Sequence, residues 1–461
     1  MIQGEKRQSS VWRRARRAIG VAACAAAMAF GVAEPASADN LFSWETDPLT
    51  GPPPSIPQFT PAPFLNNDNA PAVGAYLAGQ PVKAVKIRHG VVLTPSSIAS
   101  VYGTNNVRYT FADHEGPGAA AQVLALRNQI AGSAGTGPSF LANQSFVGNY
   151  NFYPIQNDPT RPGFIPNPNQ NNEYAASGLN MANESLYPGS IDFRSVTQGN
   201  STSPNLRSEL FTLPIVRASL VTSALPSGHK HIPYVSRFNN YDNAFMRNGV
   251  VANGETASSM YFDAAHGTAG QLLSRGDFKA LIAHYRLRGA HGVHALDPGV
   301  VGYNTAQMES DVEAGWNGIS QVNNIFAAPD RAIATLDTVV TVVGEGRKTL
   351  ESAGIAWSGV YSLSQGKLAI LLSNMSEDPK SISIPFRVGG KSFADFFTVS
   401  AGEHRLLDFT AVGTQWVLQN PGGTVIFADA NRDGVGVPEP TSILGGVFVL
   451  GMAAFARRRR A

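Results

Sequence analysis

The chain has 461 residues, of which 43% are hydrophobic and 15% charged, with 46 glycines and 30 prolines. This composition excludes a disordered polymer, and the length suffices for one large domain and a smaller one. Residues 1–38 and 437–461 together hold 10 of the 35 Lys and Arg residues and 3 of the 33 Asp and Glu residues. The rest therefore carries 25 positive and 30 negative charges, a net charge of −5 in place of the overall +2. This balance gives no electrostatic support for a nucleic-acid partner.

Residues 1–38 have the three parts of a secretory signal peptide. Six Lys and Arg residues precede the apolar, Ala-rich run Ala18–Ala33, and Ala36-Ser37-Ala38 forms an A-x-A cleavage site. The run is shorter than the ~20 residues of a membrane span. We therefore predict export and cleavage. The only cysteine, Cys24, lies in this segment, so the mature chain has no disulfide, thiol nucleophile or cysteine-bound metal.

Residues 39–72 are rich in proline, with eight between positions 48 and 71. Such a stretch predicts an extended leader or linker, with the folded body beginning near Val73.

Residues 73–335 alternate between strand and helix patterns. A strand is predicted at 107–112, followed by a helix with its apolar face on Ala120–Ile130. A second helix covers Phe278–Tyr285, with Asp277 as N-cap and Gly289 as the residue after its C-cap. Further elements are predicted as a helix at 215–225, a strand at 232–238, a strand at 290–296 and a helix at 305–322. This alternation predicts an α/β fold with a (β/α) barrel-like domain.

Residues 336–425 contain short β-rich runs in place of this alternation. In Ser381–Val388, apolar Ile382, Ile384, Phe386 and Val388 alternate with polar neighbours, as in a half-buried strand. We predict a small antiparallel β-sandwich here. A linker follows at 426–436. Within it, Asp429–Gly434 matches the first half of a calcium loop, but the twelfth position is Pro440. A solvated linker and a weak calcium site both remain open, and no metal site is predicted elsewhere.

The C-terminal residues 437–461 read Val-Pro-Glu-Pro, then an apolar run at 443–456, then four arginines at 457–460. This order resembles the PEP-CTERM sorting signal of Gram-negative bacteria. The resemblance implies the export machinery and an exosortase-type membrane protease as partners. It also implies transient membrane anchoring through 443–456. The expected location is the cell envelope, the outer surface or an extracellular matrix.

A barrel followed by a β-sandwich resembles the layout of secreted glycoside hydrolases, and Tyr285–Pro298 resembles a late barrel strand of such enzymes. The resemblance implies a carbohydrate-active hydrolase that acts on extracellular polysaccharide. A non-catalytic surface or matrix protein that binds glycans is the alternative, so the sequence leaves open whether the chain is an enzyme. No dinucleotide-binding or P-loop motif follows a predicted strand, so no cofactor is expected.

Glycoside hydrolysis requires two carboxyl groups, which in a barrel lie at the C-terminal ends of strands. The dipeptide Asn183-Glu184 resembles the Asn-Glu pair of the largest barrel glycosidase clan. That likeness implies that Glu184 is an acid/base and that Asn183 binds sugar. The further catalytic candidates are Asp297, Asp113 and Glu115, whose positions suit turns equally well.

Aromatic side chains gather next to several Asn residues between positions 140 and 153, where the Asn/Pro-rich stretch 151–175 begins. Among them, Tyr150 and Tyr153 are candidates for sugar binding. Two histidine pairs are candidate zinc ligands. His229 and His231 would share a strand face, whereas His291 and His294 would point to opposite faces. Structural histidines explain both pairs as well.

Overall fold

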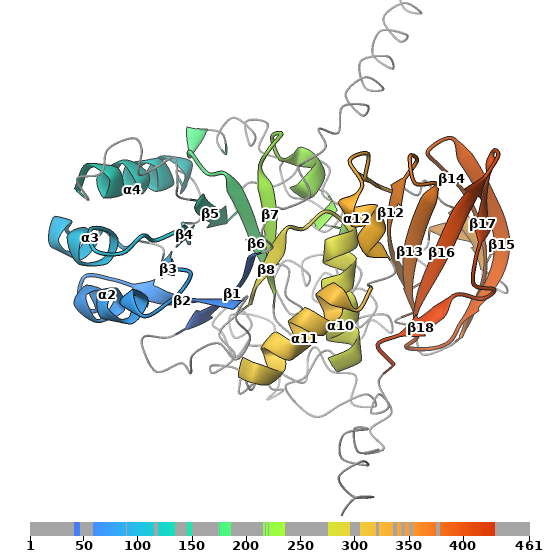
Figure 1. Ribbon diagram of the computed structural model, residues 1–461, viewed down its shortest axis with the longest axis horizontal. Helices are drawn as coiled ribbons and strands as arrows, with labels where there is room; N and C mark the ends of the chain where they lie inside the picture. Colours follow the sequence, from blue (N-terminus) through green and yellow to red (C-terminus); the bar gives the residue numbers. More distant parts are fainter. Residues whose placement is uncertain are drawn as a thin grey trace, which may run out of the picture.

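The computed structural model describes two joined parts (Figure 1), a closed barrel of parallel strands and a second, mostly antiparallel sheet. The described residues are 41–46, 59–88, 90–114, 119–133, 145–149, 174, 176–185, 215–216, 218–219, 221–235, 275–295, 305–319, 322–334, 339–342, 346–349, 354–374 and 379–428. The predicted signal peptide, the 429–434 loop and the sorting signal at 437–461 lie outside them. Among the described residues, no helix has the length and apolar character needed to cross a membrane.

The barrel confirms the predicted (β/α) architecture. Each of its eight strands pairs in parallel with the next, and β8 pairs with β1 to close the ring. The strands are β1 (Leu41–Thr46), β2 (Phe59–Leu65), β3 (Ala84–Ile87), β4 (Tyr109–Ala112), β5 (Ser145–Asn149), β6 (Met181–Ser185), β7 (Lys230–Val235) and β8 (Gly292–Ala295). The helices that alternate with them include α2 (Ala70–Ala78), α3 (Pro95–Tyr102), α4 (Ala119–Ser133), α10 (Arg275–Leu287) and α11 (Thr305–Asn317).

The prediction of an unfolded leader at 39–72 was wrong, because this segment supplies the first two barrel strands. All seven residues of β2 are buried. Pro61 and Pro63 lie two residues apart, so their missing N–H groups fall on the same side of the strand. The residues that alternate with these prolines keep their N–H groups for hydrogen bonds to the strand on the other side of β2. Proline content therefore did not prevent a buried parallel strand at this position.

Two glycines are required by the backbone around β8. Gly292 has φ +153°, and a Cβ there would overlap the carbonyl oxygen of Leu41, so closure of the ring depends on the missing side chain. Gly289 has φ +91° and follows the C-cap of α10, as predicted. The amide of Gly289 donates to Arg286 and that of Ala290 to Tyr285, which together satisfy the last carbonyls of the helix.

Two local predictions for the helices differ from the structure. Asp277 does not cap α10 but lies within its first turn, where it is buried. The single helix expected at 305–322 ends at Asn317, and Asn323–Ala327 forms a separate short helix, α12. Gly318 falls at the break and lowers the helical preference there.

Strand register separates the two faces of the barrel. Outward-facing residues such as Phe42, Trp44 and Val293 pack against α10 and α11. Much of the barrel interior is apolar, with Leu41, Ala62, Ala84, Tyr109, Phe111, Met181 and Ile232 in one buried cluster. The barrel is therefore filled by side chains, as expected for eight strands.

The second sheet folds around one apolar core, which fits the predicted sandwich. Its order is β11-β10-β14-β15-β17-β16-β13-β12-β9, with β18 beside β16. The strands are β9 (Ala332–Ile333), β10 (Val339–Val342), β11 (Gly346–Thr349), β12 (Ile355–Ser362), β13 (Lys367–Asn374), β14 (Lys380–Val388), β15 (Lys391–Val399), β16 (His404–Val412), β17 (Gln415–Leu418) and β18 (Thr424–Ile426). Inward residues of β14 and β15 meet those of β12, β13 and β16 in a single cluster. The predicted alternation in β14 is confirmed, and β9 already precedes the expected domain start at 336.

The two parts are joined through α10 and α12, which pack on the outer face of β12, β13 and β16. A buried polar chain crosses this junction. Asp277 Oδ1 lies 3.1 Å from His404 Nε2, and His404 Nδ1 lies 2.8 Å from Ser373 Oγ. Ser373 also contacts His284 Nε2 at 2.9 Å, whose Nδ1 reaches Ser358 Oγ at 2.8 Å. Buried polar contacts therefore link α10 of the barrel part to the second sheet.

Candidate functional site

The barrel interior becomes polar toward the C-terminal ends of its strands. Strand pairing puts Phe64 and Phe111 on either side of Lys86, and it puts Ser43 and Tyr234 on either side of His294. In barrel enzymes this end carries the chemistry, whereas the opposite end serves stability. We therefore take this layer and the residues just beyond it as the candidate site.

Lys86 is the charged centre of this layer. Its side chain is 7% exposed, and Nζ lies 3.6 Å from Asp113 Oδ2, on a carboxylate that is 27% exposed. The same ammonium lies 4.5 Å from the ring centre of Tyr234 and 5.6 Å from that of Phe64. The carboxylate and the two ring faces stabilise a cation that has lost most of its water.

His294 lies beside Lys86 in the same layer. Its ring stacks on Phe111 at 4.0 Å and on Tyr234 at 5.2 Å, and Nδ1 lies 2.8 Å from Ser43 Oγ. Burial, and then the charge of Lys86, hold the pKa of His294 well below 6.5, so the imidazole is neutral at pH 7. Its buried Nε2 has no hydrogen-bond partner among the described residues.

Arg88 marks the rim above Lys86, one residue past the end of β3. Its side chain is exposed, and its guanidinium lies 3.6 Å from the ring centre of Phe64. No ion pair involving Arg88 occurs within the described part of the chain. The Phe64 ring therefore packs on the face of the Arg88 guanidinium and leaves its planar N–H edge able to hydrogen-bond another molecule.

The structure places some of the sequence candidates and leaves others undescribed. Asp113 follows β4 directly and meets Lys86. Asn183 is buried, and its Nδ2 donates to the carbonyl oxygen of Ile232 at 2.8 Å, so that donor is already used by β7. Glu184 is the fourth residue of β6, in register with Pro233, but its side chain lies outside the described set. The remaining candidates, Glu115, Asp297, Tyr150 and Tyr153, are not among the described residues.

Sequence reasoning missed Lys86, Arg88 and His294 as parts of one site. The available signal was Ala84-Val-Lys-Ile-Arg88, in which two cations alternate with buried apolar residues. In a strand this spacing puts both cations on one face. Because no strand was predicted at 84–88, the alternation could not indicate that Lys86 and Arg88 share a face.

The other histidines have structural partners. His231 is fully buried, with Nδ1 at 3.1 Å from Thr222 Oγ1, and burial followed by the nearby His291 lowers its pKa to about 3. His229 lies 3.1 Å from the hydroxyl of Tyr174. Within the described residues, no cluster of three His, Cys, Asp or Glu side chains has the arrangement of a metal site.

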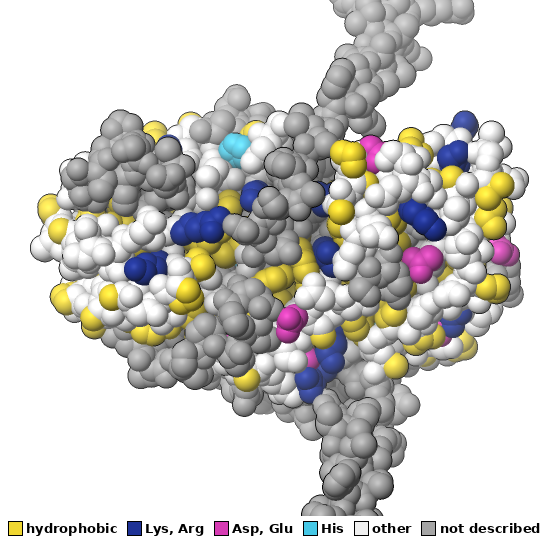
Figure 2. Space-filling view, in the orientation of Figure 1, with side chains coloured by type: hydrophobic (Ala, Val, Ile, Leu, Met, Phe, Trp, Pro, Cys, Tyr) yellow, Lys and Arg dark blue, Asp and Glu magenta, His cyan; other side chains and the backbone are white. Residues whose placement is uncertain are grey.

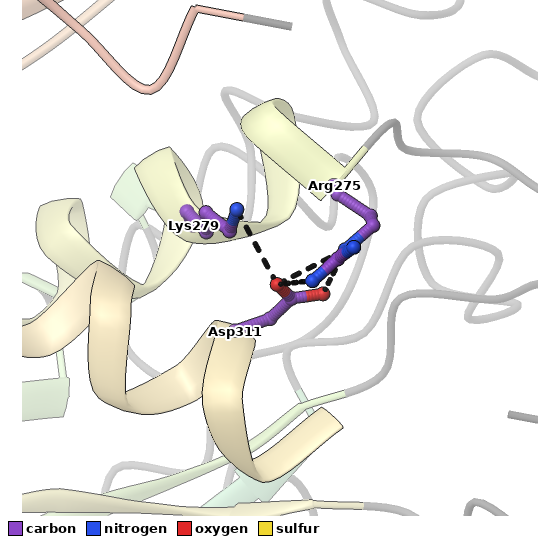
Figure 3. Close-up of polar contacts among 3 residues, drawn as sticks. All are labelled: Arg275, Lys279 and Asp311. Atoms are coloured by element: carbon purple, nitrogen blue, oxygen red, sulfur yellow. Dashed lines mark hydrogen bonds and ion pairs between the residues drawn. The ribbon is translucent and has the colours of Figure 1, made fainter. Parts of the chain in front are cut away.

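A second charged cluster lies outside the barrel, between α10 and α11 (Figure 3). The buried carboxylate of Asp311 accepts from Arg275 at 2.8 to 3.1 Å and lies 3.4 Å from Lys279. Because every charge in this cluster is engaged within it, we assign it to the docking of the two helices.

No protein-family model matches the chain, and no curated protein matches it. Among solved structures it is similar to Eubacterium rectale Amy13B, with a TM-score of 0.32 and 11% identity, over 74% of this chain and 63% of that one. It is also similar to a glycoside hydrolase family 5 structure from Bacteroides vulgatus, with a TM-score of 0.26 and 10% identity, over 85% and 92% of the two chains. A third similar structure is a conserved exported protein from Bacteroides fragilis, with a TM-score of 0.31 and 9% identity, over 78% and 68%. The chain thus spans less than two thirds of Amy13B.

Proposed function

We propose that the protein is an exported, carbohydrate-active hydrolase that cleaves extracellular polysaccharide at the C-terminal mouth of its barrel. The observation that carries this proposal is Asp113, a partly exposed carboxylate directly after β4. It lies 3.6 Å from the ammonium of the buried Lys86, which itself lies over the ring of Tyr234. A carboxylate positioned by buried side chains at this end of a barrel is the group that glycosidic-bond cleavage requires.

The reaction needs a second carboxyl group, and the candidates lie in or after strands β4, β6 and β8. Glu115 follows β4, Glu184 is in β6, and Asp297 follows β8 by two residues. In the proposed mechanism, Glu184 protonates the leaving oxygen, while Asp113 attacks the sugar or activates water from the opposite side. Lys86 orients Asp113, and aromatic faces at the mouth contact the sugar rings.

Release of reducing ends from a panel of neutral and acidic polysaccharides tests the proposal. Asp113→Asn and Glu184→Gln are expected to lower the rate by about 10²- to 10⁴-fold, because each removes a proton-transfer or nucleophilic group. Asp395→Asn is the matched control, because Asp395 is exposed on β15 of the second sheet. Binding without release of reducing ends would instead support the non-catalytic glycan-binding alternative. A rate unaffected by Asp113→Asn would refute the assigned site.

A further inference from the structure

Two cations of the described residues, Lys86 and Arg88, lie at the C-terminal mouth of the barrel. Lys86 and Arg88 lie on one face of the β3 segment, and Asp113 contacts Lys86 at 3.6 Å. Arg88 has the ring of Phe64 beneath it at 3.6 Å and is exposed on its other side. This leaves Arg88 as the charge directed at an incoming molecule.

The way in which Arg88 is held favours an anion with two oxygens. A guanidinium stacked on a ring keeps its planar N–H edge free, and this edge matches a carboxylate or sulfate through two parallel hydrogen bonds. Stacking also limits the side-chain freedom that binding would otherwise remove. Below Arg88, Lys86 adds a second positive charge, which is paired with the carboxylate of Asp113, and His294 is neutral.

Figure 2 shows how the charged side chains of the described residues are distributed on one face of the molecule. On the face shown, Lys and Arg side chains lie over both halves of the molecule, while Asp and Glu are seen over the second sheet and near the junction.

We infer that the barrel mouth recognises an acidic polysaccharide, with Arg88 binding the carboxylate or sulfate of a sugar unit next to Asp113. This inference rests on the proposed function, because it names the substrate class of the same site. Lys86 orients Asp113, and Arg88 selects the charged sugar.

Binding of the full-length protein to charge-matched polymer pairs tests the inference. Polygalacturonate is compared with its methyl-esterified form, and dextran sulfate with dextran, by affinity electrophoresis at two salt concentrations. We expect the protein to bind one acidic polymer about tenfold or more tightly than its neutral partner, since a charge-assisted hydrogen bond contributes that much. The pair that shows the preference identifies the anion as carboxylate or sulfate.

Arg88→Gln is expected to abolish the preference, and Arg88→Lys to restore only part of it, because lysine lacks the planar fork. Arg387→Gln, an exposed arginine on β14, is the matched control and should keep the preference. Circular dichroism and the melting temperature verify that each variant is folded. Equal binding to charged and neutral polymers, or a preference that survives Arg88→Gln, overturns the inference.

The outcomes also separate the inference from the proposed function. Cleavage of a neutral polymer that depends on Asp113 but not on Arg88 overturns the inference and leaves the hydrolase intact. An Arg88-dependent preference for the acidic polymer without release of reducing ends supports the anion site and refutes the proposed hydrolase activity.

Discussion

Mild acid is expected to destabilise this protein, because three histidines are buried as neutral imidazoles. Burial is the largest cause in each case and lowers the pKa of His231 to about 3, and those of His284 and His294 well below 6.5. Neighbouring ionisable groups lower these pKa values further: His291 beside His231, Arg288 and His404 beside His284, and Lys86 beside His294.

The sign and size of the effect follow from proton binding. In the unfolded chain these rings take up protons below pH 6.5, whereas in the folded protein they stay neutral. The unfolded state therefore binds more protons in acid, so the stabilisation is complete above pH 6.5 and is lost as the pH falls. For each ring, the free energy of unfolding falls by about 1.2 kcal/mol between pH 6 and pH 5, and for three rings it falls by about 4 kcal/mol.

Carboxylates act in a lower range of pH. Hydrogen bonds from Ser362 and Ser364 lower the pKa of Asp330 to about 2, so its stabilisation is present above its ordinary pKa of 3.8 and is lost only below that value. The interval between pH 6 and 5 therefore lies above the titration of Asp330.

Urea unfolding followed by tryptophan fluorescence at pH 7.5, 6 and 5 measures the effect. His231→Gln is expected to remove about a third of the pH dependence, because it deletes one of three titrating rings. His229→Gln, at a partly exposed ring two residues away, should change the dependence much less. A total loss below about 1 kcal/mol from pH 6 to 5 would refute the assignment of neutral buried rings.

Three substitutions test how the barrel is held together, each by urea unfolding at pH 7.5. Gly292→Ala is expected to lower the free energy of unfolding by about 3 kcal/mol or more, because the new Cβ overlaps the backbone of β1. Gly228→Ala is the control and should lower it by about 1 kcal/mol, because a Cβ there meets no other atom. Equal losses would contradict the role of Gly292 in barrel closure. Trp44→Phe removes the 2.9 Å hydrogen bond from Nε1 to the buried Glu309 and should cost about 2 kcal/mol, and a neutral result would show that this bond adds no stability. Asp311→Asn should cost about 3 kcal/mol by leaving two cations without their carboxylate, and less than about 0.5 kcal/mol would exclude a docking role.

Local patterns in the sequence were sufficient for much of the architecture. The alternation in Ser381–Val388 predicted which residues of β14 face the core. Gly289 predicted the end of α10, because a left-handed residue is needed where a helix stops. Alternating strand and helix patterns predicted the barrel itself. These features depend on residues within a few positions of one another, so their period and their glycines suffice to reveal them.

Only the tertiary structure decided how the barrel closes and which residues share its mouth. The Pro-rich stretch became β1 and β2 because their side chains are buried between partners far along the chain, and local proline content does not report that burial. Ser43 and His294 are 251 positions apart, yet their side chains are hydrogen-bonded. Likewise, Asp277 looked like a helix cap but lies against His404 of the second sheet. A charge is tolerated in an interior only when distant residues supply its partners, and folding alone brings those partners together.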